Sequence, residues 1–375
     1  VEGGVLKDEN ESTRFEELRM KLKEGIYSLH EKKIPATFIL LYDETWEYAR
    51  FGKKTLQEAT HHSNVFNFDV LAWYVDPKEN TAGFSPHRDR QPEVTSSSFH
   101  EDDQAKYVTL WTALSHATPE NSCLYVIPKQ YDPGYVAGDD GDEDPLQRAL
   151  STKESYQHIR ALPRQPGQSV MFTHRILHWG SRGNSKTSKE PRVAISFVCS
   201  DPSFERPYVN PNYFHGDRLP PFRIRLLLVC AQLLIYYQRF DLPKSCIRAC
   251  YEYCKEHEDE LDPTYRGKVG VEFVKAMKEA SAATSGDDKT SSTSFASIDE
   301  DDDGDDEDEA MLEEMLEAEH KGYGEFEDDY DELDPDSAGV DDEDDFSDEE
   351  EATEGALFGK RKASDDDKMS GKKSK

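Results

Sequence analysis

Three side chains in this sequence have the chemistry and spacing of metal ligands. His87 and Asp89 are two positions apart, and residues two apart in an extended segment project to the same face, so one strand end can present both. His178 lies 91 positions after His87 and would supply a third ligand from a distant strand. Two histidines and one carboxylate on one face of an octahedral ion form the facial triad of non-haem Fe(II) proteins. By spacing alone, a loop histidine and a turn-forming aspartate are the simpler interpretation.

A facial triad leaves three metal positions open, and residues after His178 indicate what fills them. The 2-oxo acid group of 2-oxoglutarate would take two positions and dioxygen the third. The far carboxylate of this diacid needs a cation, for which a bidentate guanidinium is suited. Arg192 begins a strand-like segment, and Ser196, four positions on, falls on the same strand face. We expect Arg192 and Ser196 to bind 2-oxoglutarate, and no catalytic residue beyond the metal ligands.

Short β-rich segments surround these residues. Residues 10–33 have the apolar spacing of a helix. Strand-like segments, separated by turns rich in Pro, Gly, Ser and Asn, then occur at residues 34–42, 65–76, 107–114, 123–128, 158–162, 169–172, 176–179 and 192–199. From residue 222 to about 282 the pattern is helical again. Short strands at this spacing predict an all-β sandwich or barrel as the core.

Four blocks of the sequence carry a family resemblance. FSPHRD, LWTALSHATPENSCLYVIP, QPGQSVMFTHRILHWGSRGN and PRVAISF occur in an order and spacing that resemble the phytanoyl-CoA dioxygenase family, over about residues 65–200. The resemblance implies a mainly β fold with flanking helices (α+β), built on a double-stranded β-helix of the jelly-roll or cupin kind that binds Fe(II) and 2-oxoglutarate. It carries the metal-ligand roles to His87, Asp89 and His178, and the 2-oxoglutarate role to Arg192.

The sequence departs from the family pattern at two places. Ser122 follows Asn121 where the family has glycine, and the distal His-x-Ser is lengthened by one residue. Neither change removes a ligand, but both bear on which neighbours touch the co-substrate. Further candidates for that contact are Tyr74, Trp111 and Ser181.

The resemblance also indicates the reaction. Related iron halogenases replace the metal-binding carboxylate with a small residue, so the presence of Asp89 implies hydroxylation, with O2 as co-substrate and ascorbate as an additional reductant. The substrate is left open between a small molecule, a lipid and a protein side chain. The sequence does not end in the peroxisomal Ser-Lys-Leu, so we expect a substrate other than the fatty acyl-CoA that names the family.

Charge divides the chain into two parts. Residues 287–354 hold 34 acidic and 2 basic residues, whereas the rest of the chain holds 44 acidic and 43 basic residues. A block so dense in like charge repels itself and has little apolar surface to bury, so we predict a disordered tail on a nearly neutral folded body. Such a tail disfavours direct nucleic-acid binding and favours a basic, histone-like protein partner.

A basic segment follows the acidic tract. Lys360-Arg361 and, after a ten-residue spacer, Lys372-Lys373-Ser374-Lys375 are similar to a bipartite nuclear localisation signal (360–375), although a solubilising basic end has the same composition. We therefore expect a nuclear, otherwise cytoplasmic, protein. Six scattered cysteines lack the spacing of secreted disulfide-rich domains, and the most apolar run, residues 224–237, is too short to span a bilayer. We expect neither secretion nor a membrane association.

These features predict four segments: an N-terminal helical segment at 1–33, the oxygenase core at 34–221, helices packed on the core at 222–282, and the acidic tail with its basic end at 283–375. Two other functions share the pattern, namely a catalytically inactive β-helix scaffold whose acidic tail binds histones or other basic proteins, and a zinc hydrolase with the same ligands. The intact ligand set together with Arg192 favours the oxygenase.

Two further groups have metal-binding chemistry but simpler interpretations. His174 lies four positions before His178, a spacing that suits a zinc pair on a helix, but the surrounding segment is strand-like. Cys246, Cys250 and Cys254 share one helical face, where free cysteines usually pack as small apolar side chains. We expect structural roles for both groups.

Overall fold

The computed structural model describes residues 9–61, 64–79, 82–90, 98–139, 144–240 and 242–285, without the side chains of residues 82 and 281–285. All of them belong to the first of two compact units, residues 1–315. The predicted acidic tract and basic end lie outside the described residues.

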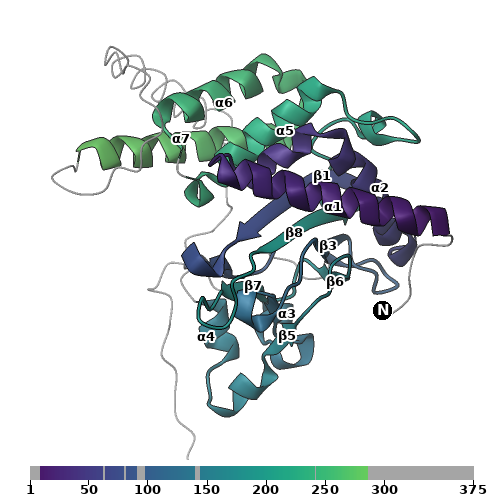
Figure 1. Ribbon diagram of the computed structural model, residues 1–375, viewed down its shortest axis with the longest axis vertical. Coiled ribbons are helices and arrows are strands. Elements are labelled where there is room, and N and C mark those ends of the chain that lie inside the picture. Colours follow the sequence, from purple (N-terminus) through teal and green to yellow (C-terminus); the bar gives the residue numbers. More distant parts are fainter. Residues whose placement is uncertain are drawn as a thin grey trace, which may run out of the picture. The chain divides into compact units, whose positions relative to one another are not determined.

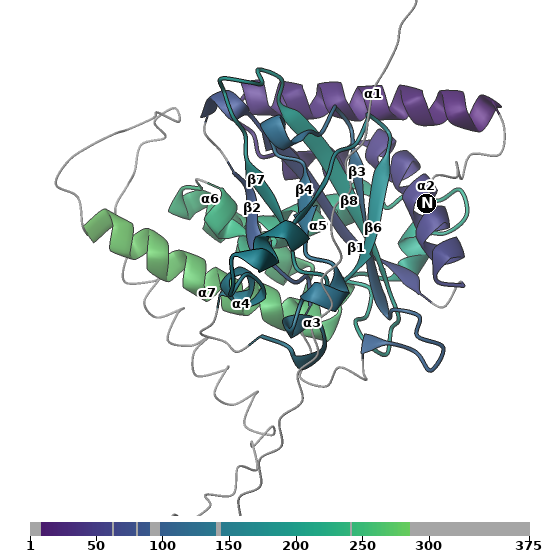
Figure 2. The same cartoon turned by 90° about the horizontal axis from the view of Figure 1, so that it is seen from below.

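Eight strands in the described part of the chain form two antiparallel sheets (Figure 2). The first sheet has the order β1 (Val65–Val75), β8 (Arg192–Ser200), β3 (Tyr107–Ala113) and β6 (Ser169–Thr173). The second has the order β2 (Ala82–His87), β7 (His178–Arg182), β4 (Leu124–Val126) and β5 (Arg160–Leu162).

The pairing of the strands is nested. The first strand pairs with the eighth, the second with the seventh, the third with the sixth and the fourth with the fifth. A chain wound in this way forms the double-sheet jelly roll, in which two sheets face each other and their inner side chains enclose the interior. The predicted double-stranded β-helix with flanking helices is therefore confirmed.

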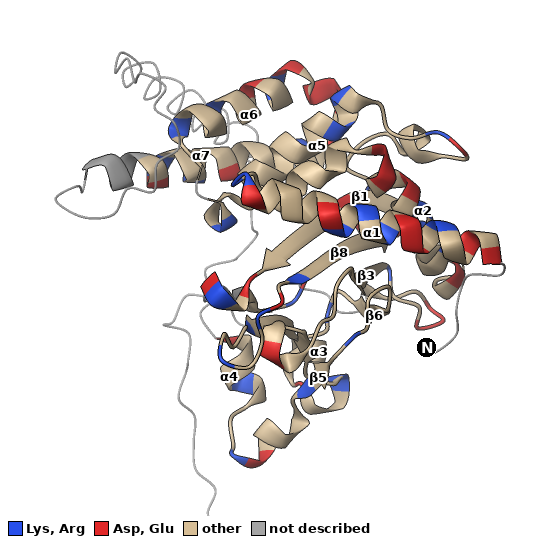
Figure 3. Cartoon of the chain, in the orientation of Figure 1, with Lys and Arg blue, Asp and Glu red and all other residues tan. Residues whose placement is uncertain are grey.

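Helices cover the outer face of the first sheet. Figure 1 shows α1 (Glu9–Glu31) running across β1 and β8, and α2 (Asp43–Ala59) contacts β8 and β3. Gly52 of α2 allows this close approach, because a Cβ there would lie 2.7 Å from the ring of Phe197 on β8. The strands of this sheet carry few charges, whereas α1 carries both signs (Figure 3), as expected for strands buried on both faces.

Three longer helices follow the sheets. α5 (Phe222–Ile235), α6 (Lys244–Glu256) and α7 (Pro263–Ser285) pack against one another, and α5 also packs against the segment before α2. Cys250 and Cys254 are buried in this packing and Cys246 is partly buried, in agreement with the expected core stripe. Two short helices, α3 (Gly134–Ala137) and α4 (Pro145–Ala149), lie in the connection between β4 and β5. No helix of the described residues has both the length and the apolar content that a membrane span requires.

The strand expected at residues 34–42 is wrong. This segment contains a 3-10 helix, η1 (Ala36–Leu41), and leads into α2, which the sequence did not predict. A short apolar run without alternation fits a buried strand and a buried helical turn equally well. Tertiary contacts decide here, because Thr45 and Trp46 of α2 donate hydrogen bonds to carbonyls of η1 at 2.5 and 2.7 Å. The strand end expected at His87 is β2, although its sequence AGFSPH is short and contains glycine and proline.

One buried polar side chain ties α5 to both η1 and the first sheet. Gln232 is 2% exposed; its Nε2 donates to the carbonyl of Val70 on β1 at 2.6 Å, and its Oε1 accepts from the hydroxyl of Thr37. A buried amide costs free energy unless both of its ends are hydrogen-bonded, and here both are.

Replacing this amide should destabilise the fold. We expect Gln232→Ala to lower the free energy of unfolding by roughly 2–3 kcal/mol, because it leaves a void and two buried polar groups without partners. Urea denaturation measures the change, with the exposed Gln238→Ala as control, for which a change within about 0.5 kcal/mol is expected. An equal, small effect of both substitutions would show that Gln232 does not fasten α5.

Candidate metal centre

Strand pairing brings the two predicted histidine ligands together. His87 ends β2, His178 begins β7, and the two residues are direct partners in the antiparallel register. Directly opposite side chains lie on the same face of a sheet, and the two imidazole centroids are 4.5 Å apart. Phe84 and Phe172 pack on His178 at centroid distances of 5.6 and 4.6 Å. Both imidazoles lie on the inner face of the second sheet; that of His178 is in a largely apolar setting, whereas that of His87 is 35% exposed.

Backbone carbonyls fix the same tautomer in both rings. Nδ1 of His87 lies 2.7 Å from the carbonyl oxygen of Ser85, and Nδ1 of His178 lies 2.9 Å from that of Ile176. A carbonyl oxygen only accepts, so we assign the ring proton to Nδ1 in each case. Nε2 then keeps a free lone pair, which is the arrangement that orients histidine ligands in metal sites.

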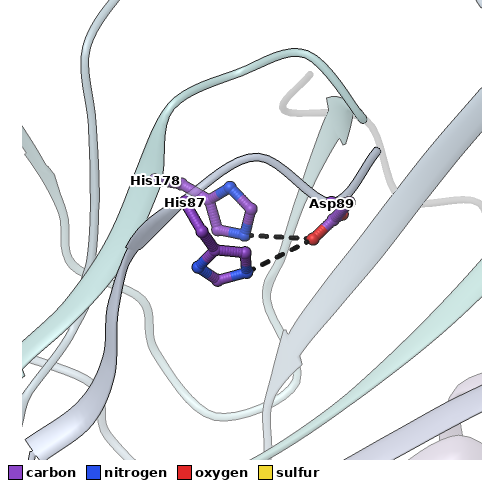
Figure 4. Close-up of side chains that lie close together, drawn as sticks. All are labelled: His87, Asp89 and His178. Atoms are coloured by element: carbon purple, nitrogen blue, oxygen red, sulfur yellow. Dashed lines mark ion pairs between the residues drawn. The ribbon is translucent and has the colours of Figure 1, made fainter. Parts of the chain in front are cut away.

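Asp89 completes the cluster. Its Oδ1 lies 3.6 Å from Nε2 of His87 and 3.4 Å from Nε2 of His178, and Figure 4 shows the three side chains converging. One ligand atom from each of the three residues lies within 4.8 Å of the others, so the three could hold one metal ion. The other carboxylate oxygen, Oδ2, accepts from the hydroxyl of Thr109 on β3 at 2.6 Å, so Oδ1 is the oxygen left for a metal.

Burial and neighbouring charges set the protonation states that a metal requires. Burial lowers the pKa of His178 to about 4, so this imidazole is neutral at pH 7. For Asp89, burial opposes ionisation, but the two imidazoles and the Thr109 hydroxyl outweigh it and hold the pKa below its usual value. A neutral imidazole at His178 and an ionised carboxylate at Asp89 are the protonation states in which these side chains bind metal.

Arg88 lies between His87 and Asp89 in sequence, but its side chain points away from the candidate metal site. Its guanidinium forms ion pairs with Asp132 at 2.6 Å and Asp139 at 2.7 Å, and it also donates to the carbonyl of Arg175. The side chains of Arg88 and Asp132 are each 1% exposed, so removing either partner would leave a buried charge. These ion pairs hold the end of β2 to the segment before α3 and thereby help to fix the ligands on either side of Arg88.

The three candidate ligands line a cavity of about 240 Å³ between the two sheets. Alternation along the strands selects the inner side chains: Asp69, Leu71 and Trp73 on β1, Tyr107, Thr109 and Trp111 on β3, and Ser196 and Val198 on β8. Thr109 was not predicted, although it lies two positions before Trp111 and therefore on the same strand face. Residues of the C-terminal region, Tyr236, Arg239 and Lys268, also line the cavity.

Arg192 is a buried cation without a carboxylate partner among the described residues. It is 1% exposed, it forms none of the ion pairs found there, and burial lowers its pKa to about 10. Its Nε donates to the carbonyl of Ser122 at 2.9 Å, Nη1 has no hydrogen-bond partner, and the guanidinium carbon lies 5.7 Å from the ring centre of Trp111. Arg192 is not itself among the cavity-lining residues, but Trp111 is, and the indole nitrogen of Trp111 is likewise buried without a partner. Two unsatisfied donors thus lie beside one end of the cavity.

The departure at Ser122 has a clear structural consequence. Ser122 has φ 74° and ψ 60°, the left-handed conformation that favours glycine, which explains the glycine of the family pattern. The serine adds a hydroxyl 3.3 Å from Nη2 of Arg192, a contact that glycine cannot make. Close packing on the other side comes from Gly83, where a Cβ would lie 2.6 Å from the same Nη2.

The remaining predicted contacts divide into two groups. Ser196 and Trp111 line the cavity, as the strand-face argument requires. Tyr74 does not, because it alternates with Trp73 to the outer face of β1, where it stacks on His30 of α1 at a centroid distance of 3.7 Å. Ser181 is on the face of β7 opposite His178 and is also absent from the cavity wall. The structure thus places Tyr74 and Ser181 away from the site, and Trp73 takes the position expected for Tyr74.

His174 is separate from the metal cluster. It is fully buried, Nδ1 lies 3.1 Å from the carbonyl oxygen of Tyr107, and Nε2 has no partner. It is not part of the group of potential ligands formed by His87, Asp89 and His178. Burial lowers the pKa of His174 to about 4. Its structural role agrees with the strand-like context of the sequence.

This buried histidine should make the metal-free protein sensitive to acid. Between pH 6.5 and about 4 the unfolded chain binds a proton at His174 and the folded chain does not, so stability falls as the pH falls. The loss approaches ~1.4 kcal/mol per pH unit for one such group. We expect His174→Asn to flatten the dependence by about 1 kcal/mol per unit between pH 6 and 5 in urea denaturation. Equal slopes for both proteins would show that His174 is not held neutral.

A family model and several solved structures match part of this chain. Residues 29–194 match the model of the family described as phytanoyl-CoA dioxygenase (PhyH). No match was found among curated proteins. Similar solved structures include the epimerase SnoN in complex with Fe3+, alpha ketoglutarate and nogalamycin RO, at 24% identity and a TM-score of 0.27 over 41% of this chain and 61% of that one.

Two other solved structures are AviO1 from Streptomyces viridochromogenes and HygX from Streptomyces hygroscopicus with nickel and 2-oxoglutarate bound. AviO1 has 20% identity and a TM-score of 0.29 over 45% of this chain and 62% of that one. HygX has 9% identity and a TM-score of 0.31 over 42% of this chain and 66% of that one. This chain spans 30% of the length of EvdMO1 and about 60% of the length of SnoN and AviO1. The segment that matches the family model, residues 29–194, includes all three candidate ligands and Arg192.

Proposed function

We propose that this protein is an Fe(II)- and 2-oxoglutarate-dependent dioxygenase that hydroxylates a substrate yet to be identified, with conversion of 2-oxoglutarate and O2 to succinate and CO2. The observation that carries the proposal is the convergence of two Nε2 atoms and one carboxylate oxygen in a cavity, with the histidine tautomers fixed by backbone carbonyls. Two histidines and a carboxylate are the ligand set of non-haem Fe(II) oxygenases.

The donor set fits iron. His87, Asp89 and His178 would hold Fe(II) on one face, which supplies O2 activation when the ion is bound. The protein's own residues orient these ligands: Ser85 and Ile176 accept from the imidazoles, and Thr109 holds the second carboxylate oxygen. Phe84 and Phe172 pack against the ring of His178 and shield it from water. Ascorbate as an additional reductant stays a prediction.

The surroundings of Arg192 fit a dicarboxylate. A buried guanidinium without a carboxylate partner is unfavourable until an anion approaches it, and Nη1 of Arg192 together with the indole N–H of Trp111 are two donors in need of an acceptor. The far carboxylate of 2-oxoglutarate would accept from them, while Ser196 lies on the same face of β8. This contact would orient the 2-oxo acid end toward the metal ligands.

Two alternatives use the same residues. A zinc hydrolase would need the three ligands but has no use for a buried, unpaired Arg192, and a catalytically inactive scaffold needs none of the four. The unsatisfied guanidinium is therefore the observation that favours the oxygenase over both.

Anaerobic titration separates these functions. With Fe(II) and 2-oxoglutarate we expect the weak metal-to-ligand charge-transfer band of the bound 2-oxo acid. Asp89→Ala and His178→Ala should abolish this band and succinate formation. Arg192→Gln should keep iron but need roughly a hundredfold more 2-oxoglutarate, about 2.7 kcal/mol of binding free energy. Arg182→Gln, an exposed arginine on β7, is the matched control and should resemble the wild type. Absence of the band in the wild type would point to the scaffold or the hydrolase.

We also propose a nuclear location and a basic protein partner for this chain, both from sequence. Residues 287–354 carry 34 acidic residues against 2 basic ones, and the basic segment at 360–375 is similar to a bipartite import signal. Carboxylates at this density attract Lys- and Arg-rich partners through interactions that salt screens.

Removal of residues 286–375 tests whether the folded body alone carries the oxygenase activity and the C-terminal region carries import and partner binding. The shortened protein should bind Fe(II) and 2-oxoglutarate as the full chain does, because the metal ligands, Arg192 and the cavity wall all precede residue 286. It should lose nuclear enrichment in fluorescence imaging, and it should lose salt-sensitive binding to purified core histones. A full chain with Lys372→Gln and Lys373→Gln should lose import alone. Loss of iron in the shortened protein would contradict the proposal.

A further inference from the structure

The mouth of the cavity is built by residues outside the family match. Tyr236 follows α5, Arg239 ends a short 3-10 helix, η8 (Tyr237–Arg239), and Lys268 belongs to α7, yet all three line the cavity that holds the metal ligands. Arg239 and Lys268 are both exposed, so they lie where the cavity opens to solvent. The family match ends at residue 194, so all three residues lie outside the matched segment.

The charged side chains deeper in the cavity are already paired with one another. Arg90 donates to Glu205 at 2.9 Å and lies 3.8 Å from Asp69. Oδ2 of Asp69 in turn accepts from the hydroxyl of Tyr208 at 3.2 Å and from that of Tyr107 at 3.4 Å. Asp69 and Glu205 therefore mainly compensate Arg90, and they have no ion-pair contact with the two cations at the mouth.

Arg239 and Lys268 have no such partner. Neither forms an ion pair or a side-chain hydrogen bond with any residue of the described part of the chain. The guanidinium of Arg239 is held instead over the ring of Tyr236, with its carbon 4.5 Å from the ring centre. A cation stacked in this way keeps its N–H groups free for a ligand. The formal charges of Arg90, Arg239, Lys268, Asp69 and Glu205 sum to +1, and the further carboxylate of the cavity, Asp89, faces the two imidazoles and not the mouth.

We propose that the primary substrate carries an anionic group, a carboxylate or a phosphate, which Arg239 and Lys268 bind at the mouth while the reacting carbon lies toward His87, Asp89 and His178. The inference rests on the proposed oxygenase function. In that function the metal and Arg192 bind the two carboxylate ends of 2-oxoglutarate. Arg239 and Lys268 are then available to bind a second anion in the same cavity. Two cations at the mouth of a cavity also raise the local concentration of anionic ligands there. The cavity volume of about 240 Å³ is below the usual range of roughly 300–1,000 Å³, which suits a small substrate or the end of a larger one.

The test uses the full chain loaded with Mn(II) and 2-oxoglutarate in the absence of O2. Isothermal titration calorimetry compares two pairs of probes: benzoate with benzamide, and phenyl phosphate with phenol. We expect the anionic member of each pair to bind at least about tenfold more tightly than the neutral one, a difference of ~1.4 kcal/mol. Stronger binding of benzoate identifies a carboxylate site, and stronger binding of phenyl phosphate identifies a phosphate site.

Variants assign the binding to the mouth. The double variant Arg239→Gln/Lys268→Gln should lose the preference for anions while its affinity for 2-oxoglutarate stays unchanged. Lys278→Gln, an exposed lysine of α7 outside the cavity, is the matched control and should keep the preference. Anionic probes that fail to bind at millimolar concentration, that bind the double variant equally well, or that displace 2-oxoglutarate would overturn the inference. A wild type that does not bind 2-oxoglutarate would instead refute the oxygenase function, so the two failures are distinguishable.

Discussion

The antiparallel register between β2 and β7 is the constraint on which the site depends. It sets His87 directly opposite His178, so that two imidazoles separated by 91 positions share one face. A slip of one residue would turn one imidazole to the other face of the sheet, because side chains alternate along a strand. Close backbone approach supports this register, since a Cβ on Gly83 of β2 would lie 3.0 Å from Cα of Gly180 on β7. The ion pairs of Arg88 hold the strand end from the outside.

The two sheets divide structure from function. Helices cover the outer face of the first sheet, and its inner face lines the cavity. Its outer side chains join the largest apolar cluster of the described residues. This packing stabilises the fold and leaves the inner faces free to carry polar groups that would otherwise be costly to bury. Asp89 and Arg192 are the clearest cases: one is a carboxylate facing two imidazoles, the other a guanidinium facing no acid. A bound cation would give Asp89, and a bound anion would give Arg192, a partner of opposite charge.

The site combines residues inside and outside the family match. The matched segment holds the three candidate ligands, the buried arginine and most of the apolar wall, whereas the region after β8 holds the two cations at the mouth. The strands that carry the candidate ligands are thus distinct from the segments that carry Arg239 and Lys268. Within the matched segment, the hydroxyl of Ser122 adds a contact to Arg192 that glycine cannot make.

The sequence by itself determined the ligand types, the strand-rich core and the face that Arg192 shares with Ser196, because these follow from residue chemistry and from the two-residue period of strands. It also separated the neutral body from the acidic tract, since charge is a property of composition. Tertiary structure decided whether residues 36–41 formed a strand or a helix, because a short apolar run fits both conformations. It also decided whether Trp73 or Tyr74 faced the cavity, because alternation along a strand defines two faces but does not say which one is the inner face. It alone brought Arg239 and Lys268 to the mouth, since no local pattern relates residues 61 to 181 positions away to the three ligands.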